Sequence, residues 1–135
     1  MIPCFGKGMR LVIIVPDGTS PFTFNVDTIN ELVIGRYDST TRTSPMIDLT
    51  PYRALQNGVS RSHAVIKWQD DTLSIIDQNS KNGTYLNERQ LVPHKSHPLL
   101  DGDHLRVGSL VLQIQLAQSD KHKKPDIPTG LLRRV

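Results

Sequence analysis

Three short polar stretches of the chain hold side chains that can bind an anion together. They are Gly35-Arg36, Ser60-Arg61-Ser62-His63 and Asn82-Gly83-Thr84. A phosphate monoester carries up to about two negative charges and three acceptor oxygens, so its receptor needs a guanidinium and small hydroxyl or amide donors. Arg36, Ser60 and Asn82 supply these groups, and the ammonium of Lys81 can reach a phosphate as a point charge. The stretches therefore predict one anion-binding surface made of loops.

The segments that must position these stretches have the pattern of β-strands. Apolar and β-branched residues recur in short runs without a helical period, at 11–15, 22–26, 31–34, 64–68, 72–76, 84–86, 105–107 and 110–116. In the last run Leu112 and Ile114 alternate with Gln113 and Gln115, which is typical of a strand with one packed and one wet face. Turn-forming residues separate the runs at short intervals, as an all-β sandwich requires. The one helical candidate is a single turn at Thr50 to Leu55, with Thr50 as its cap and Pro51 at its first position.

The three stretches, with Asp48-Leu49-Thr50-Pro51-Tyr52 and Gly58-Val59-Ser60, resemble the signature of the forkhead-associated (FHA) domain, and especially its bacterial versions. The resemblance covers roughly Met9 to Leu116. It implies an all-β sandwich of two twisted, mainly antiparallel sheets, of roughly ten or eleven strands, with the ligand loops at one end. We expect an N-terminal extension at 1–8, the FHA domain at 9–117 and a polar, basic, flexible tail at 118–135.

The resemblance also implies a role for each polar side chain in binding a phosphothreonine peptide. Arg36 would grip the phosphate, Ser60 would contact it, and Arg61 would bind the peptide or add a second charge. Asn82 would hold the peptide backbone, while Lys81 stands where the family often has threonine. The residues expected to support the site are Gly35, His63, Gly83 and Thr84, with His63 bracing the loop from within. Asn82-Gly83 is equally typical of a tight hairpin turn.

Charge and cysteine content limit the classes of function that the chain can have. Sixteen basic and thirteen acidic residues give a net charge of +3, and the basic excess lies largely in the tail, so no nucleic-acid-binding face is predicted. The single cysteine, Cys4, fits a reducing compartment. The longest apolar run, at 11–15, is too short to span a bilayer. We therefore expect a cytoplasmic protein that does not insert into membranes.

Chemistry other than binding is disfavoured. His94, His97 and His104 lack the cysteine or acidic partners of a metal site, and Ser60 with His63 lacks the Gly-x-Ser-x-Gly turn of a hydrolase. We expect no enzyme activity, metal or cofactor.

The expected function is to recruit partners phosphorylated on threonine by a Ser/Thr kinase. Two alternatives stay open, a phosphorylation-independent interaction domain that uses a sheet face, and weak binding of nucleic acid or an anionic surface by the basic tail. Phosphorylation of Thr129 in the tail would allow the domain to bind its own chain.

Overall fold

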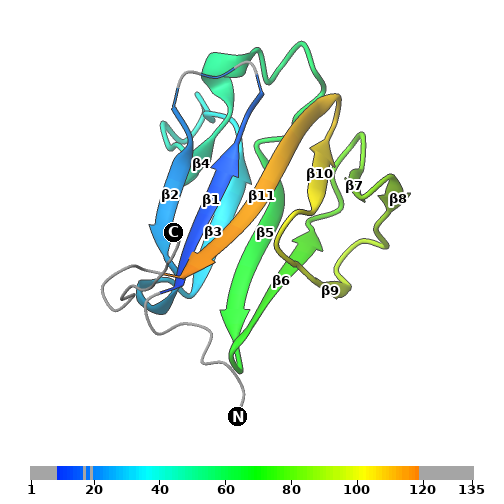
Figure 1. Ribbon diagram of the computed structural model, residues 1–135. Helices are drawn as coiled ribbons and strands as arrows, with labels where there is room; N and C mark the ends of the chain where they lie inside the picture. Colours follow the sequence, from blue (N-terminus) through cyan, green and yellow to red (C-terminus); the bar gives the residue numbers. More distant parts are fainter. Residues whose placement is uncertain (1–8, 17, 19, 119–135) are drawn as a thin grey trace.

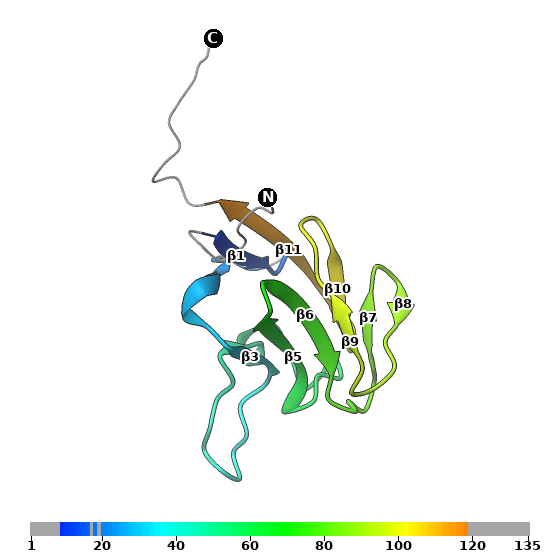
Figure 2. The same cartoon turned by 90° about the horizontal axis from the view of Figure 1, so that it is seen from below.

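The computed structural model describes residues 9–16, 18 and 20–118, which form two packed β-sheets (Figures 1 and 2). The first sheet has the order β2 (Phe22–Asn25), β1 (Met9–Ile14), β11 (Leu110–Gln118), β10 (His104–Val107), β7 (Thr84–Leu86) and β8 (Arg89–Gln90). The second has the order β4 (Ile47–Asp48), β3 (Glu31–Gly35), β5 (Ser62–Gln69), β6 (Thr72–Asp77) and β9 (Ser96–Pro98). The pairing of β3 with β4 is parallel, and the other strand pairs of the described residues are antiparallel. The predicted all-β sandwich is confirmed.

Alternating apolar residues form the core between the sheets. In β11, Leu112 and Ile114 are fully buried, whereas Gln113 and Gln115 are exposed. The same alternation in β1, β3 and β6 buries Leu11, Ile13, Leu32, Ile34 and Ile75, and β5 adds Ile66 to the core. Because side chains on a strand alternate between its two faces, each of these sequences buries one face and leaves the other outside the core.

Two short 3-10 helices, η1 (Val26–Thr28) and η2 (Thr50–Tyr52), interrupt the strands. The helical turn predicted at 50–55 is shortened to η2, and the capping role predicted for Thr50 is wrong: Leu49 holds the cap position, and no side chain caps the turn. The Thr50 hydroxyl instead donates to Asp48 Oδ1 at 2.6 Å and accepts the N–H of Tyr37 at 2.8 Å. It is therefore used to tie the segment after β3 to η2.

The first and last strands of the chain, β1 and β11, mark the two ends of the described sandwich. β1 begins at Met9, and β11 includes Gln118, which we had placed in the tail. Cys4, Thr129 and the rest of 1–8 and 119–135 lie outside the described residues. Within the part of the chain that is described, no helix is long and apolar enough to cross a bilayer.

The connections that carry the predicted site residues meet at one end of the sandwich, at the top of Figure 1. They are the β3–β4 segment, the segment from η2 to β5, and the β6–β7 segment. Hydrogen bonds from Arg36 to Val59, from Lys81 to Ser60 and from Asn82 to Gly58 join them.

Candidate functional site

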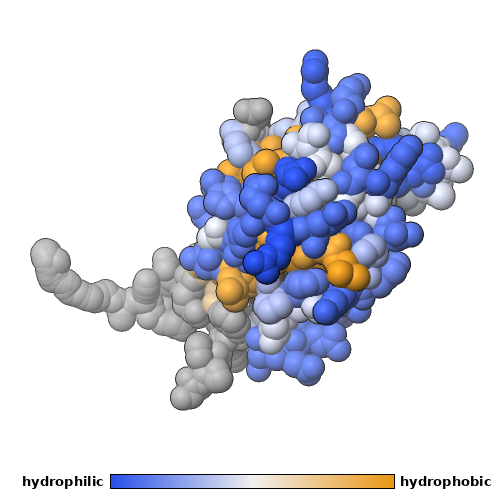
Figure 3. All heavy atoms as spheres, turned by 90° about the vertical axis from the view of Figure 1, so that its right-hand side faces the viewer, coloured by the Kyte–Doolittle hydropathy of each residue, from blue (hydrophilic) through white to orange (hydrophobic). Residues whose placement is uncertain are grey.

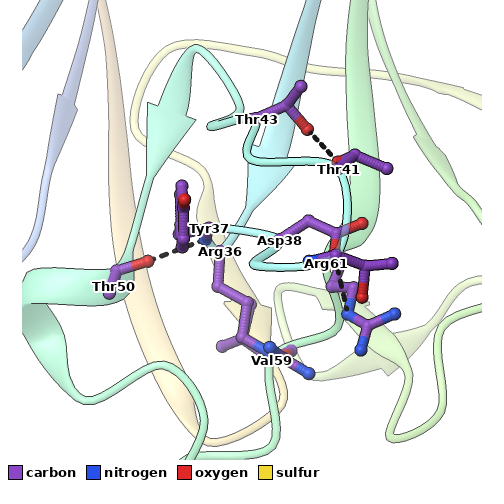
Figure 4. A network of polar contacts seen from close by, with 9 residues as sticks. Arg36, Tyr37, Asp38, Thr41, Thr43, Thr50, Val59 and Arg61 are labelled. Carbon is purple, nitrogen blue, oxygen red and sulfur yellow. Dashed lines mark hydrogen bonds and ion pairs between the residues drawn. The ribbon is translucent and has the colours of Figure 1, made fainter.

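Arg36 follows the last residue of β3 and reaches under the loop that precedes β5 (Figure 4). Its Nε donates a partly buried hydrogen bond to the carbonyl of Val59 at 2.8 Å, and its backbone N–H donates to Arg61 at 3.3 Å. Its two terminal guanidinium nitrogens have no acceptor among the described residues. One bond thus fixes the plane of the guanidinium and leaves the paired donors that suit a phosphate.

Gly35 is required by the close approach of two backbone segments. A Cβ at this position would lie 1.9 Å from the carbonyl oxygen of Arg61 and 2.9 Å from that of Ser60. The β3–β5 register shifts at this point, between Ile34 and Gly35. Any side chain here would push the Ser60-Arg61 segment away from Arg36.

His63 is fully buried and connects two of the loops. Its Nδ1 accepts the backbone N–H of Ser60 at 2.9 Å, so the proton of the neutral ring is on Nε2, which donates to the carbonyl of Gly83 at 2.8 Å. Burial lowers the pKa of this imidazole, against opposing effects of the Gly83 hydrogen bond and the nearby Asp77 charge. Both ring nitrogens are occupied by backbone groups, so neither is free to activate the Ser60 hydroxyl.

Asp77 at the end of β6 is a part of the site that sequence reasoning missed. It is 2% exposed, and its Oδ1 accepts the hydroxyls of Ser80 and Thr84, each at 2.5 Å. Its Oδ2 accepts the backbone N–H of Ser80 at 3.2 Å. The buried carboxylate therefore folds the start of the β6–β7 loop and holds β7 beside it. A polar turn residue directly after an apolar strand, with serine three positions on, was the available signal.

Lys81 and Asn82 tie the β6–β7 loop to the loop that carries Ser60. The backbone N–H of Lys81 donates to Ser60 Oγ at 3.2 Å, and Asn82 Nδ2 donates to the carbonyl of Gly58 at 3.0 Å. The Lys81 ammonium and Asn82 Oδ1 have no partner among the described residues. The hairpin interpretation of Asn82-Gly83 is wrong, because β6 and β7 belong to different sheets.

Arg61 lies on the outer side of the site and contacts Asp38 (Figure 4). Its Nε is 3.7 Å from Asp38 Oδ1, and its side chain is 54% exposed. The backbone N–H of Thr40 donates to Asp38 Oδ1 at 2.9 Å, and this bond, aided by the Arg61 charge, lowers the pKa of the carboxyl. Arg61 is thus held by one exposed ion pair, which a ligand can replace.

The β10–β11 turn supports both neighbouring loops, which the sequence also did not reveal. Gly108 N–H donates to Gly83 O at 3.3 Å, and Ser109 N–H donates to Asn57 O at 2.8 Å. Gly108 has φ +61, and a Cβ there would lie 2.4 Å from Asn57 O. Arg106 stacks on Tyr85 and donates to Gly108 O at 3.1 Å, which fixes the turn.

Comparisons with known proteins relate this chain to one family of domains. The FHA domain family model matches residues 32–108. Protein FraH of Nostoc sp. is 39% identical over 67 residues, which are 50% of this chain and 23% of that protein. The human angiogenic factor with G patch and FHA domains 1 is 30% identical over 99 residues, or 69% of this chain and 13% of that protein. The chain therefore spans less than a quarter of the length of these relatives.

Solved structures share the fold. An FHA domain studied for phosphothreonine-dependent interactions has a TM-score of 0.60 and 24% identity, with 78% of this chain and 95% of that one covered. An engineered FHA domain with a Myc-pTBD peptide has a TM-score of 0.65 and 20% identity, with 82% and 94% covered. The family match spans more than half of the chain, and it agrees with the sandwich and its loop end. This chain belongs to the FHA domain family.

Proposed function

We propose that the chain binds phosphothreonine in an extended peptide and thereby recruits proteins phosphorylated by a Ser/Thr kinase. In this proposal Arg36, Ser60 and Lys81 bind the phosphate, while Arg61 and Asn82 hold the peptide. Gly35, His63, Gly83 and Thr84 keep the loops in place. Solved structures of the same fold, one studied for phosphothreonine-dependent interactions and one in complex with a low-affinity phosphopeptide, support phosphopeptide binding as the function.

The observation that carries the proposal is the position of the Arg36 guanidinium. Its Nε is bound to the carbonyl of Val59, the residue directly before Ser60, so the free guanidinium nitrogens lie beside the Ser60 loop. Arginine suits this position because its planar fork matches two phosphate oxygens, whereas an ammonium offers a single point of charge.

The decisive experiment is calorimetric titration with a phosphothreonine peptide selected from an oriented library, beside its unphosphorylated copy. We expect Arg36→Ala to weaken phosphopeptide binding by about 2 to 4 kcal/mol, the cost of removing one partner of a close charge pair. Arg36→Lys should restore only part of the affinity. Undiminished binding by the alanine variant, or equal binding of both peptides by the wild type, would contradict the proposal.

The second candidate function, a phosphorylation-independent interaction through a sheet face, is supported by one apolar row. Val33, Val65 and Ile76 are register partners across β3, β5 and β6, and they alternate with the residues of the core. Only 5% of Val65 is exposed, so this row offers little apolar area to a partner. The side of the molecule drawn in Figure 3 is mainly hydrophilic with small separate apolar areas. Binding of the unphosphorylated peptide in the same titration would favour this candidate.

A further inference from the structure

An open groove of about 530 Å³ lies at the loop end, between three connections that are distant in sequence. They are the β1–β2 connection, the segment that starts with η2, and the β10–β11 turn. The lining includes Pro16, Pro51, Tyr52, Arg53, Leu110 and Val111. We name it the Tyr52 groove.

Two parts of the wall of the Tyr52 groove lie close in sequence to residues that hold Arg36 or its neighbour. Pro51 and Tyr52 belong to η2, whose first residue, Thr50, accepts the N–H of Tyr37 directly after Arg36. Further along, Asn57 lines the groove two residues before Val59, whose carbonyl holds Arg36. A chain lying across the Ser60 loop can therefore continue into the groove.

The walls of the Tyr52 groove suit a bulky apolar side chain. Proline rings, the Tyr52 ring and three aliphatic residues line it, and Val111 is 38% exposed. Asn57 uses its amide nitrogen to bind the carbonyls of Tyr52 and Arg53 at 3.3 and 3.0 Å, so this side of the groove is fixed before a ligand arrives. A fixed wall lowers the entropic cost of binding.

Arg53 gives the groove its charge. Its backbone lies in the left-handed region at φ 62. Its N–H donates to the carbonyl of Thr50, and its carbonyl accepts the N–H of Asn57. Its guanidinium has no acceptor among the described residues, and none of the described residues that line the groove carries a carboxylate. An anionic group beside the apolar side chain would therefore complement the groove.

We propose that the Tyr52 groove binds a second segment of the phosphorylated partner, a bulky apolar residue next to an aspartate or glutamate, separated along the peptide from the phosphothreonine. This inference rests on the proposed function and adds a sequence requirement to it. In this arrangement phosphorylation determines whether a partner binds, and the groove contributes to selectivity among phosphorylated proteins.

The probe is a positional-scanning peptide library with one fixed phosphothreonine and degenerate flanks. The wild type should enrich a bulky apolar residue beside Asp or Glu at one distant position. Arg53→Glu should reverse the acidic preference to a basic one and weaken the selected peptide about tenfold, because like charges then meet. Val111→Glu should remove the apolar preference. Arg89→Glu and Val92→Glu change an exposed arginine on β8 and a 59% exposed valine outside the groove lining, and they should leave both preferences intact.

The outcomes separate this inference from the proposed function. If binding depends on the phosphate but the library shows no residue preference at distant positions, the proposal for the Tyr52 groove is overturned and the proposed function stands. Selection that persists in Arg53→Glu and Val111→Glu, with melting curves that match the wild type, also overturns it. Binding that ignores the phosphate overturns the proposed function and this inference with it.

Discussion

The buried and exposed halves of the proposed phosphate site hold their polar groups in different ways. On the buried half, His63, Asp77 and Thr84 are 0 to 2% exposed, and each is bound to a neighbouring loop or strand. On the exposed half, Arg36 is held by one side-chain bond and Arg61 by one ion pair, and the Lys81 ammonium has no partner among the described residues. The buried half sets loop geometry before a ligand arrives, and the exposed half keeps donors available for it.

The sharpest test of the buried half is Gly35→Ala. The added Cβ would meet the Arg61 carbonyl at 1.9 Å, and a backbone atom cannot move aside as a side chain can. We expect a loss of unfolding free energy of about 3 kcal/mol or more, at the upper end of overpacking costs, together with loss of phosphopeptide binding. Urea unfolding measures the first effect and calorimetry the second.

Gly102→Ala is the matched control for that variant. Unlike Gly35, Gly102 has a positive φ, +89, and no atom lies within 4 Å of its would-be Cβ. It should show backbone strain alone, about 1 kcal/mol. If the two variants lose equal stability, the close approach at Gly35 is not what requires glycine.

Paired substitutions on the two halves should separate stability from affinity. His63→Ala leaves the Ser60 N–H unpaired and removes the shorter of the two hydrogen bonds to the Gly83 carbonyl, so we expect it to lower unfolding free energy by about 1 to 3 kcal/mol and to weaken phosphopeptide binding. Ser60→Ala removes a hydroxyl whose protein partner, the Lys81 N–H, is exposed to water, so stability should stay nearly constant while affinity falls. Melting and binding curves with the opposite pattern would exchange these roles.

Lowering the pH should reduce the free energy of unfolding through His63. The unfolded chain takes up a proton on His63 near its ordinary pKa of 6.5, whereas burial keeps the folded ring neutral to lower pH. Because the unfolded state then binds more protons, unfolding free energy is constant above this pKa and falls as pH drops from 6.5 through the folded value. Urea unfolding across this range should show the decline, and His63→Gln should flatten it. A wild-type profile as flat as that of the variant would contradict the prediction.

The smallest effect is expected on the exposed half, at Asp38. Asp38→Asn keeps an acceptor for the Thr40 N–H but removes the charge that holds Arg61. Stability should not change measurably, because exposed ion pairs contribute little. Phosphopeptide affinity should rise modestly, since Arg61 is no longer shared with a carboxylate. Asp71→Asn, an exposed carboxylate in the β5–β6 turn, is the control and should bind as the wild type does.

The sequence predicted features that depend on local pattern and missed those that depend on tertiary contact. The alternation of Leu112 and Ile114 with glutamines identified β11, whereas β4, β8 and β9 have only two or three residues each and carry no period. The need for glycine at 108 comes from Asn57, about fifty positions earlier, and no local rule links them.

The site divides along the same line. The sequence pattern singled out Arg36, Ser60, Lys81 and Asn82 as candidate ligand-binding residues, because their types and order are visible directly. It did not single out Asp77 or Asp38, because an acidic residue near an expected phosphate is informative only once its hydrogen-bond partners are seen. Candidate ligand-contacting residues are thus easier to single out from the sequence than the residues that position them.

The hydrogen bond from the Ser60 amide to an imidazole nitrogen has a spectroscopic consequence. A backbone amide that donates to His63 Nδ1 loses its acceptor when that nitrogen takes up a proton. The amide resonance of Ser60 should therefore shift with the protonation of a ring that is itself fully buried, and its hydrogen exchange should quicken as the bond opens. Since Ser60 also carries the hydroxyl proposed to contact the phosphate, this one amide reports in a single spectrum on ligand arrival and on the state of the loop beneath it.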